Sequence, residues 1–288
     1  MDTHLLGAHF SIAKGLAEAL YTARSYGCSA LQIFTKNAST WKERVLKPHD
    51  TESFAQARRE TGITAVASHT AYLINLAAVT PKKQALSYQA LKAELLRSNT
   101  LDIPMVVLHP GSHMNAGQAS GVEKITRSLN TLFAETPDVT SRLLLETTAG
   151  QGSSIGHTFE QLAAILDGIE NPQRIGVCFD SCHVFAAGYD LRTRTTYDQT
   201  MQAFDMAIGF DQLHLIHLND ALKPLGSKVD RHTHIGKGHI GIQGFTHIMN
   251  DSRLTHIPKI IETPKGKGRT DFDKLNLNRL RGLIRPKQ

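Results

Sequence analysis

Cysteine is scarce in this chain, which has three cysteines among 288 residues, at positions 28, 178 and 182. A small, odd number of cysteines in a chain long enough to bury a sizeable core argues against a disulfide-stapled scaffold. Cys178 and Cys182 flank Asp180, but a single pair at this spacing does not form a zinc finger. We therefore expect this pair to be buried, free thiols.

Long apolar runs are also absent. No segment approaches the roughly 18 apolar residues that cross a bilayer, and Met1 to Ala13 lacks the basic stretch and apolar core of a secretion signal. We therefore expect a cytoplasmic protein without membrane contact. The sequence has no low-complexity tract, linker or recognisable association surface, which predicts a monomer with one domain spanning residues 1–288.

Charge is moderately one-sided. Against 26 Asp and Glu residues stand 32 Lys and Arg residues, which gives a net charge of +6 with neutral histidines. This balance makes a polyanionic partner such as nucleic acid plausible. A basic surface that is simply solvated would give the same balance, so charge alone does not decide between the two.

Short β-branched or apolar runs alternate with amphipathic runs along the whole chain, which is typical of βα units and a parallel sheet. Eight short runs are predicted strands: Leu5–Phe10, Ala30–Thr35, Thr64–His69, Met105–His109, Arg142–Glu146, Ile175–Asp180, Leu213–Leu218 and Pro258–Glu262. The predicted helices are Gly15–Tyr26, Thr51–Thr61, Pro81–Asn99, Val122–Glu135, Thr158–Gly168, Thr195–Ile208, Gly244–Asp251 and Leu275–Leu283. This alternation predicts an α/β fold, one closed (β/α)8 TIM barrel.

Six of the predicted strands end in a residue that can bind a metal. These residues are His69, His109, Glu146, Asp180, His217 and Glu262. The carboxyl ends of parallel barrel strands meet on one face, so these side chains should converge there. Convergent imidazoles and carboxylates predict a polynuclear metal site at the C-terminal ends of the strands.

Two short segments supply further metal-binding residues. Asp180 and His183 lie three residues apart, and Asp230 and His232 lie two apart in an expected loop. With the strand ends, these are more ligands than one tetrahedral zinc ion uses, so two or three metal ions are expected. Zn²⁺ and Mn²⁺ both accept such mixed ligands. For His9, near the end of the first strand, orienting a metal ligand or contacting a phosphate is as plausible as a purely structural role.

Seven ordered motifs spread over nearly the whole chain resemble the endonuclease IV family of zinc-dependent apurinic/apyrimidinic endonucleases. They read IFTKN at 33–37, YLINL at 72–76, LHPGSH at 108–113, CFDSCH at 178–183, HLND at 217–220, DRH at 230–232 and IET at 261–263. The resemblance implies a DNA repair enzyme that hydrolyses the phosphodiester 5′ to abasic sites in duplex DNA. The expected products are a 3′-hydroxyl and a 5′-deoxyribose phosphate, with trimming of blocked 3′ ends as a second activity.

The resemblance also implies how the metals are held. It assigns His69, His109 and Glu146 to one zinc ion, Glu146, Asp180, His217 and Glu262 to a second, and His183, Asp230 and His232 to a third. Mn²⁺ is an alternative at one of the three sites. Glu146 and Glu262 are the expected catalytic residues, because they would hold the attacking water.

Contacts to DNA are expected from loops on the same face. Tyr72 and Leu73 are expected to wedge into the base stack, and Lys36 and Arg231 to contact the DNA. Lys237 and Lys265 are further candidates for phosphate contacts.

The sequence departs from the family pattern at three places. Thr147 stands where the family often has Asn, and Thr70 follows His69 where the family has Asp or a similar residue. The metal ligands do not depend on either of these two positions. The loop from Lys36 to Trp41 lacks the arginine that some members insert into DNA.

Two other functions fit parts of the pattern. Sugar isomerases use the same barrel with one or two divalent ions among carboxylates, but the imidazole-rich pair Asp230 and His232 and the basic loops favour the nuclease. A metal-containing protein that binds damaged DNA without cleaving it is a third alternative. Cleavage of abasic DNA distinguishes the nuclease from both of these alternatives, because neither would cleave it.

Overall fold

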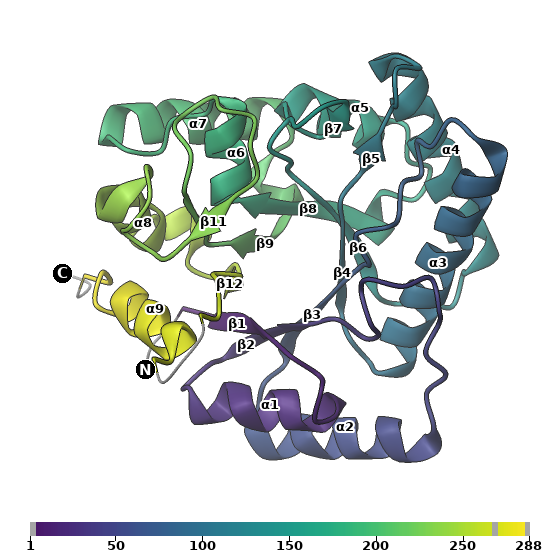
Figure 1. Cartoon of the computed structure of the whole chain (residues 1–288), viewed down its shortest axis with the longest axis horizontal. Coiled ribbons are helices and arrows are strands. Elements are labelled where there is room, and N and C mark those ends of the chain that lie inside the picture. The colour runs from purple at the N-terminus through teal and green to yellow at the C-terminus, as the bar shows by residue number, and fades with distance from the viewer. Residues whose placement is uncertain (1–3, 267–269, 286–288) are drawn as a thin grey trace.

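The computed structural model describes residues 4–266 and 270–285 and has a closed barrel of eight parallel strands at its centre (Figure 1). This confirms the predicted TIM barrel. Around the barrel the strands follow their order in the chain: β1 (Leu6–Phe10), β2 (Ala30–Ile33), β3 (Ala65–His69), β4 (Met105–Leu108), β6 (Arg142–Glu146), β8 (Ile175–Asp180), β9 (Leu213–His217) and β12 (Lys259–Ile261). β12 pairs with β1 and closes the barrel.

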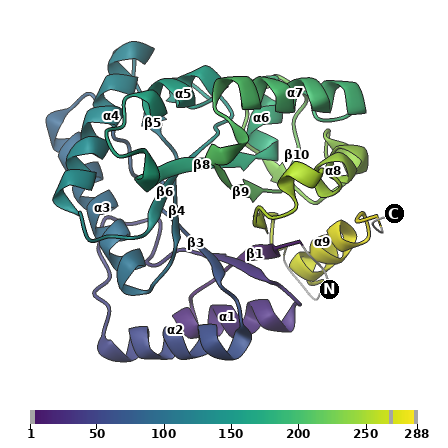
Figure 2. The same cartoon turned by 180° about the vertical axis from the view of Figure 1, so that it is seen from behind.

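Helices surround the barrel on the outside, as Figures 1 and 2 show from opposite sides. The α-helices are α1 (Leu16–Ser25), α2 (Pro48–Thr61), α3 (Pro81–Thr100), α4 (Gln118–Glu135), α5 (Phe159–Asp167), α6 (Ser181–Ala187), α7 (Arg194–Ala207), α8 (Gly241–Met249) and α9 (Phe272–Arg281). Short 3-10 helices lie at η1 (Pro172–Arg174), η2 (Phe210–Gln212) and η3 (Ser252–Leu254). In the described part of the chain, no helix is long and apolar enough to cross a membrane.

Besides the 3-10 helices, two antiparallel strand pairs and one α-helix lie outside the predicted pattern. Two antiparallel two-residue pairs, β5 (Gly111–Ser112) with β7 (Ser154–Ile155) and β10 (Asp220–Ala221) with β11 (His232–Thr233), extend from the mouth of the barrel. The helix is α6, which starts directly after β8. Asp180 both ends the strand and caps the helix, because its Oδ1 accepts a hydrogen bond of 2.9 Å from the His183 backbone N–H.

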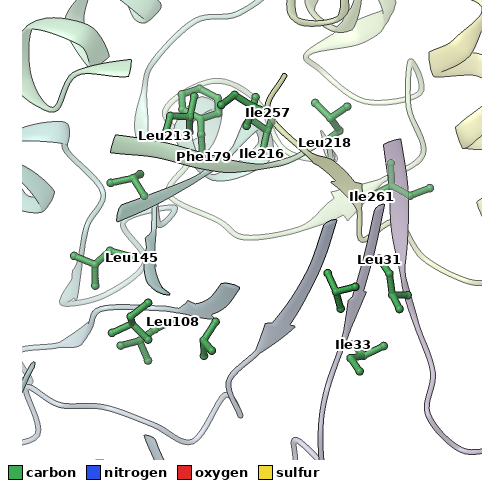
Figure 3. Packing of buried hydrophobic residues seen from close by; sticks show 14 of the residues in the cluster. Leu31, Ile33, Leu108, Leu145, Phe179, Leu213, Ile216, Leu218, Ile257 and Ile261 are labelled. Atoms are coloured by element: carbon green, nitrogen blue, oxygen red, sulfur yellow. The ribbon is translucent and has the colours of Figure 1, made fainter. Parts of the chain in front are cut away.

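Two apolar layers line the sheet. The larger cluster lies between the strands and the helices, and Figure 3 shows Leu31, Leu145 and Ile261 among its residues. The smaller cluster fills the barrel interior with one residue from each of seven strands: Ala30, Ala67, Val107, Leu144, Cys178, Leu215 and Ile260. We call these seven residues the inner layer. Alternate residues of each strand thus face the helices and the barrel axis.

Candidate metal centre

The carboxyl ends of the barrel strands carry a layer of polar side chains. Two positions after each inner-layer residue stands a polar one: Gln32, His69, His109, Glu146, Asp180, His217 or Glu262. On β1, His9 holds the equivalent position two residues after Gly7. Because residues two apart on a strand point to the same side, these eight side chains point into the mouth of the barrel.

The structure brings His69, His109 and Glu146 together as a first group. Nε2 of His69 lies 3.0 Å and Nε2 of His109 lies 2.9 Å from Oε2 of Glu146. One ligand atom from each of the three residues falls within 4.8 Å of the others, which is a spacing that a metal ion can bridge. Glu146 and His69 are buried, whereas His109 is partly exposed, so this group opens to the outside.

A second group is built around the other oxygen of Glu146. Nδ1 of His217 lies 2.9 Å from Oε1 of Glu146 and 3.2 Å from Oε2 of Glu262. It also lies 3.8 Å from Oδ2 of Asp180. Since Oε2 of Glu146 faces the first group and Oε1 faces the second, this carboxylate is shared between them.

The third group forms away from the strand ends. His183 comes from α6, Asp230 lies two residues before β11, and His232 is the first residue of β11. Nε2 of His183 lies 3.2 Å from Oδ2 of Asp230, and Nε2 of His232 lies 3.3 Å from Oδ1 of the same carboxylate. The helix cap at Asp180 holds His183 in place, and the β10–β11 pairing holds His232.

The histidine rings are oriented by backbone carbonyls. Nδ1 of His69 lies 2.8 Å from the Thr70 carbonyl, and Nδ1 of His183 lies 2.8 Å from the Thr147 carbonyl. A carbonyl oxygen only accepts hydrogen bonds, so each Nδ1 carries a proton and each Nε2 of a neutral ring carries a lone pair. His232 follows the same pattern, with Nδ1 3.4 Å from the Glu262 carbonyl.

These lone pairs are the observation that tests whether metal ions fit the site. Within the described residues, Nε2 of His183 and Nε2 of His232 have no hydrogen-bond partner, although both atoms are buried. Each faces an oxygen of Asp230 at little more than 3 Å. A lone pair against a carboxylate oxygen is repulsive unless a proton or a cation lies between them. The donor set therefore fits metal ions.

The electrostatics of the site point the same way. Burial works to raise the pKa of Glu146, but the His109 and His217 imidazoles beside it hold that pKa well below its usual range. Burial works to lower the pKa of His183, but the carboxylates of Asp180 and Asp230 outweigh it and raise that pKa well above its usual value. The carboxylates thus draw positive charge onto the ring nitrogens, which either a proton or a metal ion can supply.

Sequence comparison places the chain among known proteins. The family model described as a xylose isomerase-like TIM barrel matches residues 20–281. A probable endonuclease 4 from Citrifermentans bemidjiense is 45% identical over 280 residues, covering 97% of this chain and 99% of that relative. A probable endonuclease 4 from Geobacter sulfurreducens is also 45% identical over 280 residues, covering 97% and 94%. This chain belongs to the endonuclease IV family.

Structural comparison agrees with this membership. The crystal structure of endonuclease IV from Thermus thermophilus matches with a TM-score of 0.86 at 33% identity, covering 96% of this chain and 98% of that chain. A D-tagatose 3-epimerase-like protein matches with a TM-score of 0.71 at 17% identity, covering 96% of each chain, which shows a shared fold alone. Membership of the endonuclease IV family identifies the chain as an enzyme.

The two residues expected to wedge into DNA, Tyr72 and Leu73, follow His69 of the first group in the chain. Tyr72 is 68% exposed and Leu73 is 38% exposed, which is unusual for large apolar side chains and leaves both free to contact a ligand. The Tyr72 ring lies 5.9 Å from the His69 ring, measured between centroids. A cavity of about 320 Å³ separates Tyr72 from the third group, and its lining includes Asn75, His109 and Asp230.

The basic residues expected to contact DNA differ in whether their charged groups are exposed. Arg231 and Lys237 are exposed. Lys36, in contrast, is buried, and its ammonium donates to the Thr40 carbonyl at 2.6 Å and pairs with Glu43 at 3.2 Å. Lys36 therefore holds its own loop together, and in this conformation it does not present its charge to DNA. Lys265 is likewise engaged, with the His9 carbonyl and Asp273 each at 2.7 Å.

The cysteines lie beneath or beside the site. Cys178 belongs to the inner layer, two residues before Asp180, and burial raises the pKa of its thiol to about 12. Cys182 is also buried, and its Sγ contacts the Arg231 carbonyl at 3.6 Å. Neither forms a disulfide, which agrees with the expectation of buried thiols.

Two buried carboxamides in the site were missed by the sequence reasoning. Asn219 donates from Nδ2 to Oδ2 of Asp180 at 2.7 Å, and its Oδ1 accepts from the Glu262 N–H at 2.8 Å. Gln32 contacts His217 and Glu262. The signal for Gln32 is its place two residues after Ala30, which puts it in the same polar layer as the candidate ligands. Asn219 lies outside that repeat, and its only signal in the sequence is that it lies two residues after His217.

Proposed function

We propose that this chain is a metal-dependent DNA repair endonuclease that hydrolyses the phosphodiester 5′ to an abasic site in duplex DNA. The observation that carries the proposal is the convergence of three metal-binding groups beside two exposed apolar side chains, Tyr72 and Leu73. The relatives named probable endonuclease 4 support it, because they align over nearly the whole chain.

Zn²⁺ is the proposed metal at all three groups, with Mn²⁺ as the alternative at one. His69, His109 and Glu146 would hold one ion, Glu146, Asp180, His217 and Glu262 a second, and His183, Asp230 and His232 a third. When bound, such ions neutralise the phosphodiester charge, activate water and stabilise the departing oxygen.

Glu146 and Glu262 are the proposed catalytic residues. Both carboxylates flank Nδ1 of His217, at 2.9 and 3.2 Å. The nearby imidazoles hold their pKa values well below the usual range, so both remain ionised and can accept a proton or hydrogen bond from the attacking water. The partial exposure of Glu262 leaves room for a phosphate to approach.

Selection of an abasic site follows from the shape of the rim. A sugar without a base is cheaply turned out of the helix, and the cavity beside His109 is small for a ligand pocket, at about 320 Å³. Tyr72 and Leu73 project where they can fill the space left in the base stack. Arg231 and Lys237 would contact phosphates of the same duplex.

The proposed products are a 3′-hydroxyl and a 5′-deoxyribose phosphate, and trimming of blocked 3′ ends is proposed as a second activity. Both follow from breaking the bond between phosphorus and the 3′ oxygen at the same groups. We further propose that the enzyme acts in the cytoplasm as a monomer with one domain over residues 1–288.

A duplex with one reduced abasic analogue tests this function. The analogue cannot undergo elimination, so any cleavage is hydrolytic. We expect a nick on its 5′ side whose 3′ end a DNA polymerase extends directly. Binding without a nick would support the damage-binding protein, and turnover of a ketose or aldose without a nick would support the sugar isomerase; either result overturns the proposal.

A further inference from the structure

Gln32 occupies the polar layer at the one strand, β2, that offers neither an imidazole nor a carboxylate there. Its side chain is fully buried. Oε1 lies 2.7 Å from Nε2 of His217, on the far side of the barrel mouth, and Nε2 lies 2.6 Å from Oε1 of Glu262. Nε2 also lies 3.0 Å from Nδ1 of His9. One carboxamide therefore links strands β1, β9 and β12 through the site.

The orientation of this carboxamide follows from its neighbours. The ionised Glu262 carboxylate only accepts hydrogen bonds, so the amide nitrogen of Gln32 must face it, and the amide oxygen must face His217. The reverse orientation would place two oxygens 2.6 Å apart. An amide oxygen also only accepts, so Nε2 of His217 must carry the proton, and Nδ1 is left to face Glu146 and Glu262.

We propose that Gln32 is a positioning residue of the metal centre that fixes His217 as the tautomer with its proton on Nε2. In His69, His183 and His232 a backbone carbonyl accepts a hydrogen bond from Nδ1 and fixes the tautomer of the ring in the same way. His217 ends β9 with Nε2 directed across the barrel. There the side-chain oxygen of Gln32 accepts the hydrogen bond that a backbone carbonyl accepts from the other rings. Gln32 also directs Oε1 of Glu262 away from the group, which leaves Oε2 facing Nδ1 of His217.

This inference rests on the proposed metal centre and deepens it, so it is tested on metal binding itself. In Gln32→Leu the side chain keeps much of its volume but loses its contacts to His217, Glu262 and His9. Removing an outer partner of a metal ligand typically weakens metal affinity about 10- to 100-fold. Competition with a zinc-binding dye on the whole chain should therefore show one ion per chain held at least about tenfold more weakly.

Gln161→Leu is the matched control. Gln161 is an equally polar, buried glutamine whose Oε1 accepts from the Gly156 and His157 N–H groups, at 2.7 and 3.1 Å. Its loss should lower thermal stability but leave zinc affinity unchanged. Equal zinc affinity of Gln32→Leu and the wild type would overturn the proposal, as would equal weakening in both variants.

The wild-type chain provides a test that needs no variant to fold. Nuclear magnetic resonance of zinc-loaded protein labelled with ¹⁵N at histidine reports which ring nitrogen of each residue carries the proton. We expect His217 to show a slowly exchanging Nε2–H. A protonated Nδ1 or an unprotected Nε2 at His217 would overturn the proposal.

Failure of this inference is distinguishable from failure of the proposed function. If the wild type nicks abasic DNA while His217 has the other tautomer, only the role of Gln32 is wrong. If His217 has the expected tautomer and zinc is bound but no nick forms, only the nuclease function is wrong.

Discussion

The Glu146 carboxylate lies 2.9 Å from Nδ1 of His217, although β8 stands between the two strands that carry these residues. The contact crosses the barrel mouth because both side chains are in the polar layer above the inner layer. The other Glu146 oxygen lies 2.9 Å from His109. Glu146 therefore joins two of the three metal-binding groups.

Replacing Glu146 by Gln should reduce incision of abasic DNA by about a thousandfold or more, which is a loss of about 4 kcal/mol of transition-state stabilisation. The reason is that glutamine lacks the negative charge of the Glu146 carboxylate, which the first and second metal-binding groups share. Incision rate, circular dichroism and metal content are measured together. Strong residual incision with normal metal content would show that Glu146 is not catalytic.

The Lys36→Met variant tests whether Lys36 stabilises its own loop or contacts a DNA phosphate. Because the Lys36 ammonium is bonded to Thr40 and Glu43, the variant should be destabilised by up to about 2 kcal/mol. The slope of log K for DNA against log salt should not change. Arg231→Gln is the comparison, because loss of one phosphate contact should reduce that slope by about 1. A reduced slope in Lys36→Met would show that Lys36 does contact a DNA phosphate.

Tyr72→Ala should weaken binding of abasic duplex about 5- to 150-fold, since stacking on an aromatic ring contributes about 1–3 kcal/mol per base. Affinity for intact duplex should change much less. Met206→Ala serves as the control, because Met206 is 81% exposed on α7, outside the barrel. Equal effects of the two substitutions would mean that Tyr72 does not enter the base stack.

Lys259 predicts a pH dependence of stability that is independent of the metals. It is fully buried at the start of β12, its ammonium donates to the Ile257 carbonyl at 2.9 Å, and burial lowers its pKa to about 8. Between pH 8 and about 10.4 the unfolded chain holds this proton and the folded chain does not, so unfolding free energy should rise with pH by about 3 kcal/mol. Denaturant unfolding of wild type and Lys259→Met checks this, and an equal rise in both would contradict it.

The fold was predictable because each βα unit carries its own signal. All eight barrel strands begin within one residue of their predicted positions, since apolar runs bounded by polar residues fix where strands lie. Helix starts were less accurate. α2 begins at Pro48 rather than Thr51, because Asp50 caps the Lys47 N–H at 2.9 Å and the helix starts before its apolar stripe.

The contacts inside the site were predictable only in part. Strand ends indicate which side chains share a face, so the placement of Glu146 and His217 in one layer follows from the sequence. Whether a long side chain near a strand end points into the barrel mouth or bonds to its own loop depends on contacts between distant segments. Lys36 and Gln32 both lie near the end of β2, yet one clamps Thr40 and the other bonds to His217.

We propose that the three side-chain groups hold metal ions that the cleavage of DNA requires. The most direct measurement is the number of zinc ions per chain by native mass spectrometry, paired with incision of a reduced abasic duplex by the same sample before chelation, after chelation and after zinc is restored. We expect close to three ions per chain, loss of incision when the ions are removed, and recovery of incision when zinc is restored. Full incision by metal-free protein would contradict it.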